Sequence, residues 1–284
     1  MMIIGCNTVA FRRFPLEFAL ERIASAGYLY VEVEANLSWC PHADPWKDDP
    51  LTFKERIQSY GFLGVSAIGS HRELITSEDG VKDIAQALQW CQAADIPVVL
   101  TGEGRKPAEI STPEALSILK DRLDYLASVA EKYQVRLALE DHGSISLTPD
   151  GLPQILALCQ SEWVGVNFDT ANIHRGDYVG TDRGGFEWKL GAATSFSETE
   201  LLDKVVTRVF HTHIKDVVGR DAVTLGKGEI DLLGCLRILN DGGYQGVLSY
   251  ETEGMQSPEE SQAMIIASRE YLLNATKFEP ISPA

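Results

Sequence analysis

Hydrophobic and polar positions alternate in blocks along the whole chain. Short apolar runs rich in β-branched residues are separated by longer stretches in which apolar positions recur every three or four residues. The first pattern is typical of buried strands and the second of amphipathic helices. Eight strand-like runs begin near Ile3, Leu29, Leu63, Pro97, Val135, Val164, Val209 and Gly246.

Helix signals lie between these runs. Ser111 and Ser257 each precede a proline close to the expected helix start and an acid in the first turn, which is a favourable N-terminal sequence. Gly61 and the pair at 242–243 fall where helices should end. The predicted helices span 15–26, 51–60, 77–93, 112–133, 153–159, 230–241 and 258–273.

Eight strand–helix units of roughly thirty-odd residues match the count and length of a (β/α)8 TIM barrel. We therefore predict one α/β barrel domain over residues 1–275, followed by a C-terminal tail at 276–284. An open doubly wound sheet is the alternative. Two connections, 35–47 and 172–199, are longer than usual and are candidate lids or binding loops.

Four of the apolar runs end on side chains that can bind a metal. A single acid at a strand end is more often a helix cap or an ion-pair partner. Three carboxylates meeting at one barrel mouth would repel each other, so a bound cation is the simplest stabilising partner. The predicted ligands are Glu140, Asp169, His213 and Glu251, at the ends of runs 136–140, 165–169, 209–213 and 247–251. This donor set suits one divalent metal ion: Mn²⁺, Mg²⁺, Co²⁺ or Zn²⁺.

Other polar residues near the expected mouth are candidates for contact with a substrate. His71 follows the third strand, and with Glu34 it could reach the substrate or hold a ligand from outside. His142 is equally compatible with substrate contact and with a plain loop position. Lys215 could bind a substrate oxygen, or it could balance the acids of the site. Asn172, His71, His142 and Lys215 are the predicted substrate-binding residues.

Several neighbouring residues have simpler readings. His211 lies two positions before His213, and we interpret it as a satisfied core histidine or an outer partner of the metal site. We expect Glu103 to be a solvated loop acid or a cap, and His174 with Arg175 to carry ordinary solvated charge. The glycines at 226 and 228 indicate a structural turn, because they lack a full phosphate-loop fingerprint.

Composition narrows the function classes. The 284 residues are 44% hydrophobic, which is enough for a substantial core. A formal net charge of −16 argues against nucleic acid and anionic membranes as partners. Five scattered cysteines without a CxxC pair fit reduced thiols in a cytoplasmic protein. The start lacks a basic leader and a long apolar segment, and we expect the mature chain to begin there. A homo-oligomer is compatible with the sequence but not specified by it.

The strand-end motifs resemble those of the sugar phosphate isomerase/epimerase family, which belongs to the xylose isomerase-like TIM barrels. The resemblance covers about residues 3–273 and implies one divalent metal held by the four predicted ligands, with Glu140 and Glu251 also acting as the acid/base pair. Many epimerases of this kind carry His three positions after the strand-six acid, where this chain has Asn172. The motifs are LALEDHG at 137–143, NFDTAN at 167–172, HTHIKD at 211–216, LGKGEID at 225–231 and SYE at 249–251.

A metal beside two carboxylates also indicates a reaction class. A divalent ion stabilises the charge that forms when a proton leaves the carbon next to a carbonyl, and flanking glutamates can move that proton. We therefore predict a metal-dependent isomerase or epimerase of carbohydrate metabolism, acting on a small sugar, keto-sugar or keto-inositol. A dehydratase or lyase using the same site is the alternative. A DNA-repair endonuclease of the abasic-site type and a non-catalytic sugar-binding barrel are less favoured, because the first needs more ligands and the second would keep buried acids unused.

Overall fold

The computed structural model describes residues 2–179, 185–188, 196–219, 221–253 and 256–277; of 175–179 and 185–188 it describes the backbone alone. Within these residues, eight parallel strands close into a barrel, because β1 pairs with both β2 and β13. The predicted (β/α)8 barrel is thus confirmed, and the open sheet is excluded. The barrel strands are β1 (Ile3–Asn7), β2 (Tyr30–Asn36), β4 (Gly64–Gly69), β5 (Val98–Thr101), β6 (Arg136–Glu140), β7 (Val164–Asp169), β10 (Val209–Ile214) and β13 (Val247–Tyr250).

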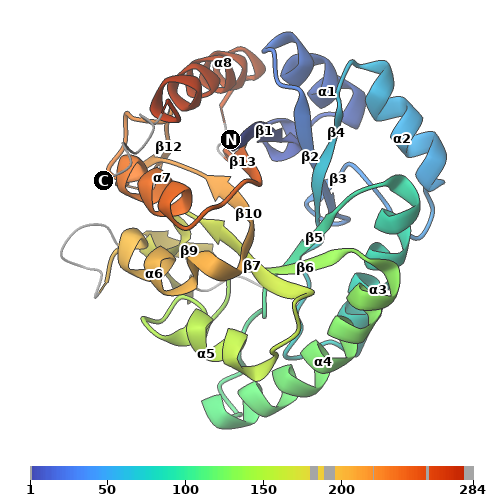
Figure 1. The fold of residues 1–284 in the computed structure, drawn as a ribbon, viewed down its shortest axis with the longest axis vertical. Coiled ribbons are helices and arrows are strands. Elements are labelled where there is room, and N and C mark those ends of the chain that lie inside the picture. Colours follow the sequence, from blue (N-terminus) through green and yellow to red (C-terminus); the bar gives the residue numbers. More distant parts are fainter. Residues whose placement is uncertain (1, 180–184, 189–195, 220, 254–255, 278–284) are drawn as a thin grey trace, which may run out of the picture.

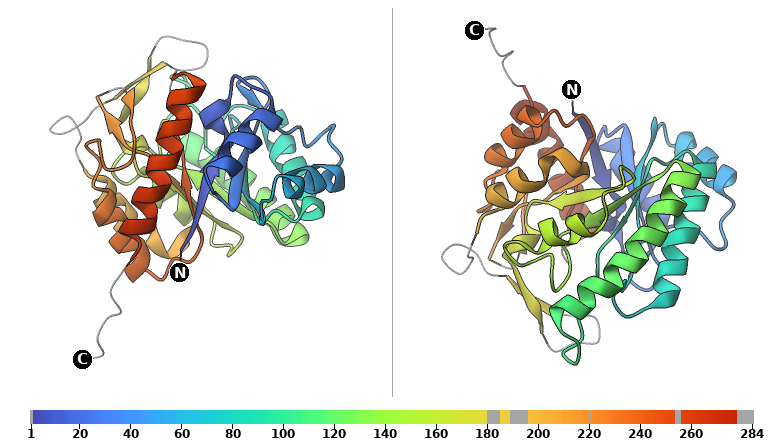
Figure 2. Two further views of the ribbon diagram at one scale, coloured as in Figure 1. Left: turned by 90° about the horizontal axis from the view of Figure 1, so that it is seen from above. Right: turned by 60° about the horizontal axis from the view of Figure 1, so that its bottom comes forward.

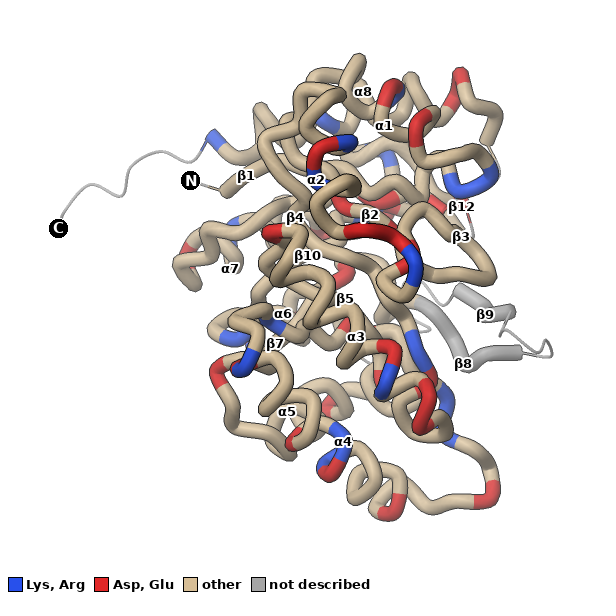
Figure 3. Tube along the Cα trace, turned by 90° about the vertical axis from the view of Figure 1, so that its right-hand side faces the viewer, with Lys and Arg blue, Asp and Glu red and all other residues tan. Residues whose placement is uncertain are grey.

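Helices form a ring outside the strands (Figure 1). Figure 2 shows the last helix, α8, beside the first, α1, where the two ends of the chain complete the ring. Acidic and basic residues are intermixed over this outer layer (Figure 3). The helices are α1 (Leu16–Ser25), α2 (Pro50–Ser59), α3 (Glu78–Ala94), α4 (Thr112–Tyr133), α5 (Gly151–Leu158), α6 (Glu198–Val205), α7 (Leu232–Asp241) and α8 (Pro258–Ala275), with short 3-10 turns η1 (Thr8–Phe11), η2 (Asn172–His174) and η4 (Val206–Arg208).

The predicted helix ends agree closely with the structure. The Ser111 side chain accepts a hydrogen bond from the backbone N–H of Glu114, and Ser257 forms a reciprocal capping box with Glu260. Gly61 follows the end of α2 with a φ of +88°, a value that suits glycine. Sequence patterns gave no indication of α6, which begins inside the predicted loop 172–199 and has its own capping box at Ser197.

Short antiparallel strand pairs follow three of the barrel strands, in the connections at the mouth of the barrel. The predicted long connection at 35–47 contains β3 (Cys40–Pro41), which pairs antiparallel with the end of β2. The connection at 172–199 contains β8 (Arg175–Val179) and β9 (Gly185–Trp188), also antiparallel. Residues 180–184 and 189–195 of this connection lie outside the described residues, as does most of the predicted tail at 276–284. A last pair is β11 (Val217–Val218) with β12 (Asp221–Ala222).

Apolar side chains fill both sides of the barrel wall. A large core packs between strands and helices, and a smaller cluster contains Ala67, Val98, Leu100 and Ala138. Because Ala138 shares a face of β6 with Glu140, the small cluster lies inside the barrel and closes it below the polar site. All five cysteines are buried without a disulfide, as expected for packing residues. Among the described residues, no helix is long and apolar enough to cross a membrane.

Candidate metal centre

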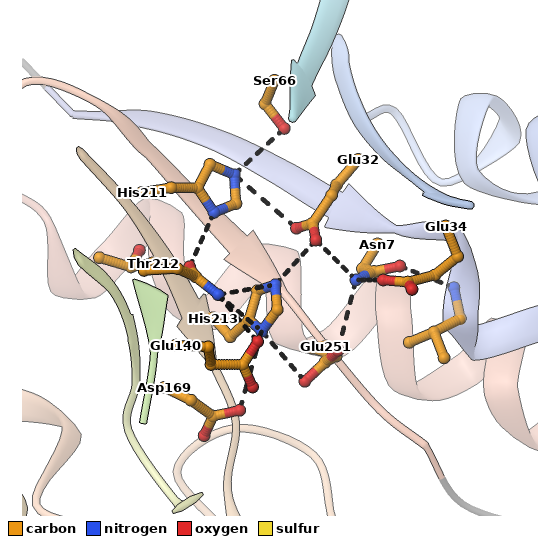
Figure 4. A network of polar contacts seen from close by, with 12 residues as sticks. Asn7, Glu32, Glu34, Ser66, Glu140, Asp169, His211, Thr212, His213 and Glu251 are labelled. Carbon is orange, nitrogen blue, oxygen red and sulfur yellow. Dashed lines mark hydrogen bonds and ion pairs between the residues drawn. The ribbon is translucent and has the colours of Figure 1, made fainter. Parts of the chain in front are cut away.

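The four predicted ligands meet at the carboxyl ends of four barrel strands. Glu140 and Asp169 are the last residues of β6 and β7, His213 lies near the end of β10, and Glu251 directly follows β13. Adjacent parallel strands in this register bring their end residues to one point of the mouth. All four side chains are buried, with at most 5% of any residue exposed. Figure 4 shows Glu140, Asp169 and Glu251 gathered around one edge of the His213 ring.

Distances among these four residues fit a single metal ion. Nδ1 of His213 lies 3.4 Å from Glu140 Oε2, 3.4 Å from Glu251 Oε2 and 3.8 Å from Asp169 Oδ2. Neighbouring donor atoms about 2.0–2.2 Å from a common ion are about 2.8–3.6 Å from each other in octahedral or tetrahedral geometry, so two of the distances fall in this range and the one to Asp169 is slightly longer. One possible ligand atom from each of Glu140, Asp169 and His213 lies within 4.8 Å of the other two, and the same holds for Glu32, His211 and His213. The residues present therefore fit a divalent cation.

Lys215 supplies one positive charge beside these acids. Its Nζ lies 2.6 Å from Glu251 Oε2 and 3.0 Å from Asp169 Oδ2, and it also contacts Glu253 at 3.2 Å. The two oxygens facing Lys215 are buried and make no hydrogen bond of good geometry with the described residues, so the contact is one of charge. In the state that binds a metal, with the three ligand carboxylates ionised and His213 neutral, the one ammonium leaves two negative charges. A divalent cation would balance them.

The two glutamates of the site differ electrostatically. Burial raises the pKa of Glu251 to about 8, despite the nearby charges of His213 and Lys215. For Glu140, burial acts in the same direction, but the charges of His213 and His71 outweigh it and hold the pKa well below the ordinary value. Glu251 is accordingly the carboxylate better matched to proton transfer near neutral pH.

The other edge of the His213 ring contacts a residue that the sequence reading missed. Nε2 of His213 lies 2.7 Å from Oε1 of Glu32, which is fully buried on β2. The short contact with Glu32 favours a proton on Nε2, so Nδ1 is the nitrogen that would bind a metal after losing its own proton. The missed signal is the spacing of Glu32 and Glu34, which places two acids on the same inner side of a buried strand.

Asn7 connects these inner acids to the metal centre. Its Nδ2 lies 2.9 Å from Glu32, 3.0 Å from Glu34 and 3.3 Å from Glu251, in each case at Oε1. Burial and the negative charge of Glu32 raise the pKa of Glu34 well above its ordinary value. One amide therefore ties the catalytic candidate Glu251 to two buried acids of β2 (Figure 4).

His211 lies below His213 and holds an outer position, the arrangement expected from their spacing. Its Nδ1 donates to Oδ1 of Asn167 at 3.0 Å, and Asn167 Nδ2 in turn lies 3.1 Å from Glu140 Oε2. Burial lowers the pKa of His211 to about 4, so its ring is neutral. The neutral histidine and the amide together orient Glu140.

The predicted substrate-binding residues lie around the same mouth. His71 Nε2 is 3.5 Å from Glu140 Oε2, and the His71 and His142 rings meet edge to face at a centroid distance of 5.4 Å. Nδ2 of Asn172 donates to Glu140 Oε1 at 2.6 Å. His71, Asn172 and Lys215 therefore touch the predicted metal ligands directly, and His142 reaches them through His71.

Two polar loop residues are buried. Glu103 is buried and not solvated, because Oε1 accepts the backbone N–H groups of Ile145 and Ser146 and so fixes a neighbouring loop. His174 is also buried, and its Nε2 lies 3.0 Å from Oε2 of Glu198. Glu103 therefore acts as a cap of backbone N–H groups, the second of its two predicted roles, whereas the prediction of solvated charge at His174 was wrong because its loop folds back and buries the ring against Glu198. The side chain of Arg175 lies outside the described residues.

The predicted structural turn at 226–228 has a clear anchor. The backbone N–H groups of Gly226 and Gly228 both donate to Oδ2 of Asp216, at 2.9 Å each, and Ile230 donates to Oδ1. A glycine is required at 228, because a Cβ there would lie 2.1 Å from Asp216 Oδ1. The glycines thus hold a loop beside Lys215 and do not form a phosphate loop.

Sequence comparison places these residues in a known setting. The family model of xylose isomerase-like TIM barrels matches residues 20–274. An uncharacterized protein of Methanocaldococcus jannaschii is 25% identical over 201 residues, which is 68% of this chain and 62% of the relative. An inosose dehydratase of Clostridium perfringens is 25% identical over 185 residues, 58% of this chain and 54% of the relative. The matched region thus spans less than two thirds of the length of these curated relatives.

Solved structures share the fold over nearly the whole chain. An L-ribulose 3-epimerase has a TM-score of 0.76 at 16% identity, with 98% of this chain and 95% of that chain covered. The IolI protein, solved with a bound zinc atom, has a TM-score of 0.74 at 20% identity, covering 97% and 98%. At these identities the likeness is one of fold.

Proposed function

Because the chain belongs to the xylose isomerase-like TIM barrel family, we propose that it is a divalent-metal-dependent isomerase or epimerase of a small sugar, keto-sugar or keto-inositol. The observation that carries the proposal is the convergence of Glu140, Asp169 and Glu251 on Nδ1 of His213. These four residues would hold the cation. When bound, it would polarise a substrate carbonyl and stabilise the negative charge that develops as the neighbouring proton leaves.

The chain's own residues supply the rest of the reaction. Glu251 is the first candidate to take the proton, since its raised pKa suits a base at neutral pH. Lys215 and His71 flank the site and would orient the oxygens of the substrate. The burial of the whole cluster excludes water from the charged atoms and strengthens their interactions.

Dehydration of a similar keto substrate is the second candidate. Inosose dehydratase is the named activity of one relative. Lys215 places an ammonium 2.6 Å from Glu251, so a base and a proton donor stand side by side. Such a pair could remove a proton from one carbon and protonate a hydroxyl that leaves from the next.

Hydrogen exchange in D₂O tests the proposal without knowledge of the product. The Mn²⁺-loaded protein is incubated with D-allulose, L-ribulose and an inosose, and deuterium uptake is read by mass spectrometry. We expect E251Q to lose about 10²- to 10⁴-fold in exchange rate, the usual value of a positioned acid or base. E131Q, on the exposed outer side of α4, is the matched control and should exchange at the normal rate.

E140Q should lose exchange as well, because it alters a metal ligand. Removal of the metal with a chelator should stop exchange, and added Mn²⁺, Mg²⁺, Co²⁺ or Zn²⁺ should restore it. Normal exchange by both glutamine variants, or no exchange on any of the three compounds, would contradict the proposed function.

A further inference from the structure

Asn172 is tied to two of the proposed metal ligands. It opens η2 directly after the loop that follows β7, and its side chain is fully buried. Its Nδ2 donates to Oε1 of Glu140 at 2.6 Å, and its backbone N–H donates to Oδ1 of Asp169 at 3.1 Å. A short side-chain hydrogen bond inside a buried charged cluster fixes the orientation of the carboxylate that accepts it.

Both oxygens of Glu140 are engaged, and they are engaged differently. Oε2 faces His213, Asn167 and His71, at 3.4, 3.1 and 3.5 Å. Oε2 is therefore the oxygen placed toward the proposed metal. The other oxygen, Oε1, is the atom that would have to accept a proton from a substrate, and this is the atom to which Asn172 donates.

The corresponding oxygen of Glu251, the one turned away from His213, is held more loosely. Its Oε1 receives the longer contact from Asn7, at 3.3 Å. Its Oε2 faces the ammonium of Lys215, which is itself a proton donor. The surroundings of the two glutamates are thus unequal, because the amide hydrogen bond on Oε1 is 2.6 Å long at Glu140 and 3.3 Å long at Glu251.

We propose that Asn172 is a positioning residue that holds Glu140 as a metal ligand and leaves Glu251 as the single base of the reaction. This inference rests on the proposed function and narrows it. With one base on one side of the substrate, the favoured outcomes are isomerisation between neighbouring carbons or loss of a hydroxyl. Epimerisation by two bases on opposite faces is disfavoured.

The proton balance is as follows for either outcome. The Glu251 carboxylate takes the proton from the carbon next to the carbonyl, and the C–H electron pair forms the C=C bond of an enediolate. In isomerisation, the Glu251 carboxyl returns the proton to the former carbonyl carbon, and a hydroxyl proton passes between the two oxygens. In dehydration, that proton goes to the β-hydroxyl, which leaves as water, and a new C=C bond remains.

Metal affinity provides a test that is independent of turnover. N172L keeps the side-chain size and removes the donor, so Mn²⁺ titrated into the metal-free variant should bind about 10- to 100-fold more weakly, the usual effect of losing an outer partner of a ligand. N172H retains an N–H donor and should recover most of this loss. N240L lies near the C-terminal end of α7, which leads into the start of β13 at the end of the barrel opposite the mouth, and it is the control that should bind Mn²⁺ as the unchanged protein does.

Product analysis tests the single-base assignment. In D₂O, the unchanged protein should convert D-allulose, L-ribulose or an inosose to an isomer or a dehydrated product, and it should form no epimer at the exchanged carbon. Formation of that epimer with deuterium in the product alone is the signature of two bases and would overturn the assignment. Equal Mn²⁺ affinity of N172L and the unchanged protein would overturn the positioning role. Absence of all exchange would count against the proposed function, while the Mn²⁺ titration would still decide the role of Asn172.

Discussion

At the scale of single residues, the contact between His213 and Glu32 sets the protonation of the proposed metal centre. Burial alone would lower the pKa of His213, but the carboxylates of Glu251, Glu32 and Glu140 raise it well above its ordinary value. His213 must release a proton from Nδ1 to bind a metal, and the Glu32 contact at 2.7 Å keeps the other proton on Nε2. Glu32 is thus a positioning residue that contacts the nitrogen of His213 opposite the one proposed to bind the metal.

We expect E32Q to weaken Mn²⁺ binding about 10- to 100-fold while the protein remains folded. The glutamine oxygen can still accept the Nε2 proton but no longer carries the charge that raises the basicity of the ring. Calorimetric titration of Mn²⁺ into metal-free E32Q and into the control E131Q gives the comparison. Identical affinities of the two variants would show that Glu32 is a packing residue only.

The meeting of the four proposed ligands at one rim could be predicted from the sequence, whereas the residues around them could not, and position in the strand explains the difference. Glu140, Asp169 and His213 stand at strand ends, where the barrel architecture itself assigns them to one rim. Glu32 and Asn167 lie within strands, and their partners come from strands far away in the chain. Strand register and barrel closure decide which inward-facing polar residues come into contact. Neither can be predicted from a local sequence pattern.

At the scale of elements, the Glu198–His174 pair joins the loop that carries Asn172 to two helices. Glu198 Oε2 lies 3.0 Å from His174 Nε2 in η2, and Oε1 accepts the backbone N–H of Asp231 at 2.6 Å, one residue before α7. Glu198 is also the first residue of α6. One buried carboxylate thus connects η2 to α6 and α7, which are neighbours in the helix ring (Figure 1).

Removal of this carboxylate should destabilise the fold. E198A leaves a buried imidazole and a backbone N–H without their partner, so we expect a loss of about 1–3 kcal/mol in the free energy of unfolding. E198Q retains an acceptor for Asp231 and should lose less. Urea unfolding of E198A, E198Q and the unchanged protein gives the three free energies of unfolding. A change within about 0.5 kcal/mol for E198A, the range of ordinary surface substitutions, would contradict the structural role.

Element prediction succeeded where local chemistry decides and failed where tertiary contacts decide. The helix starts at Ser111 and Ser257 follow from side chains that satisfy their own backbone, and the structure confirms both. The helix α6 is too short for a repeated pattern of apolar residues to stand out in the sequence. Its first residue, Glu198, is buried against His174, which lies in another element. A residue such as His174 appears solvated in sequence because its partner, Glu198, lies on another element.

At the scale of the whole molecule, eight alternating units were sufficient to predict the barrel, because strand count and unit length leave few other solutions. The pairing of β1 with β13 then brings Glu251, which directly follows the last barrel strand, into contact with Asn7 at the end of the first strand. Barrel closure therefore completes the site as well as the fold. Stability of the closed barrel and charge at the metal centre are consequently coupled.

This coupling predicts how the stability of the metal-free protein depends on pH. Glu34 and Glu251 are acids whose folded pKa is raised, mainly by burial, with Glu251 at about 8. Above about pH 4.5 these two acids bind more protons in the folded protein than in the unfolded chain, so their contribution to stability falls as the pH rises from about 5 to 8. His42, His71 and His211, whose pKa values are lowered by burial, act in the opposite direction below about pH 6.5. His213 has the same sign as the two acids, because its raised pKa contributes stability that is lost as the pH rises. Glu140 and Glu32, whose pKa values are lowered, lose their contribution only in more acid solution.

A divalent metal should reverse the trend, because it binds the deprotonated ligands. At 100 times the dissociation constant it adds about 2.7 kcal/mol of stability, and each kcal/mol raises the melting temperature of a protein near this size by about 2–4 °C. Scanning calorimetry of the protein with and without Mn²⁺ should show a metal-free melting temperature that falls between about pH 5 and pH 8, and a rise on adding Mn²⁺ that is larger at the higher pH. A Mn²⁺-dependent rise of equal size at both pH values would mean that protons and metal do not compete for the same four residues.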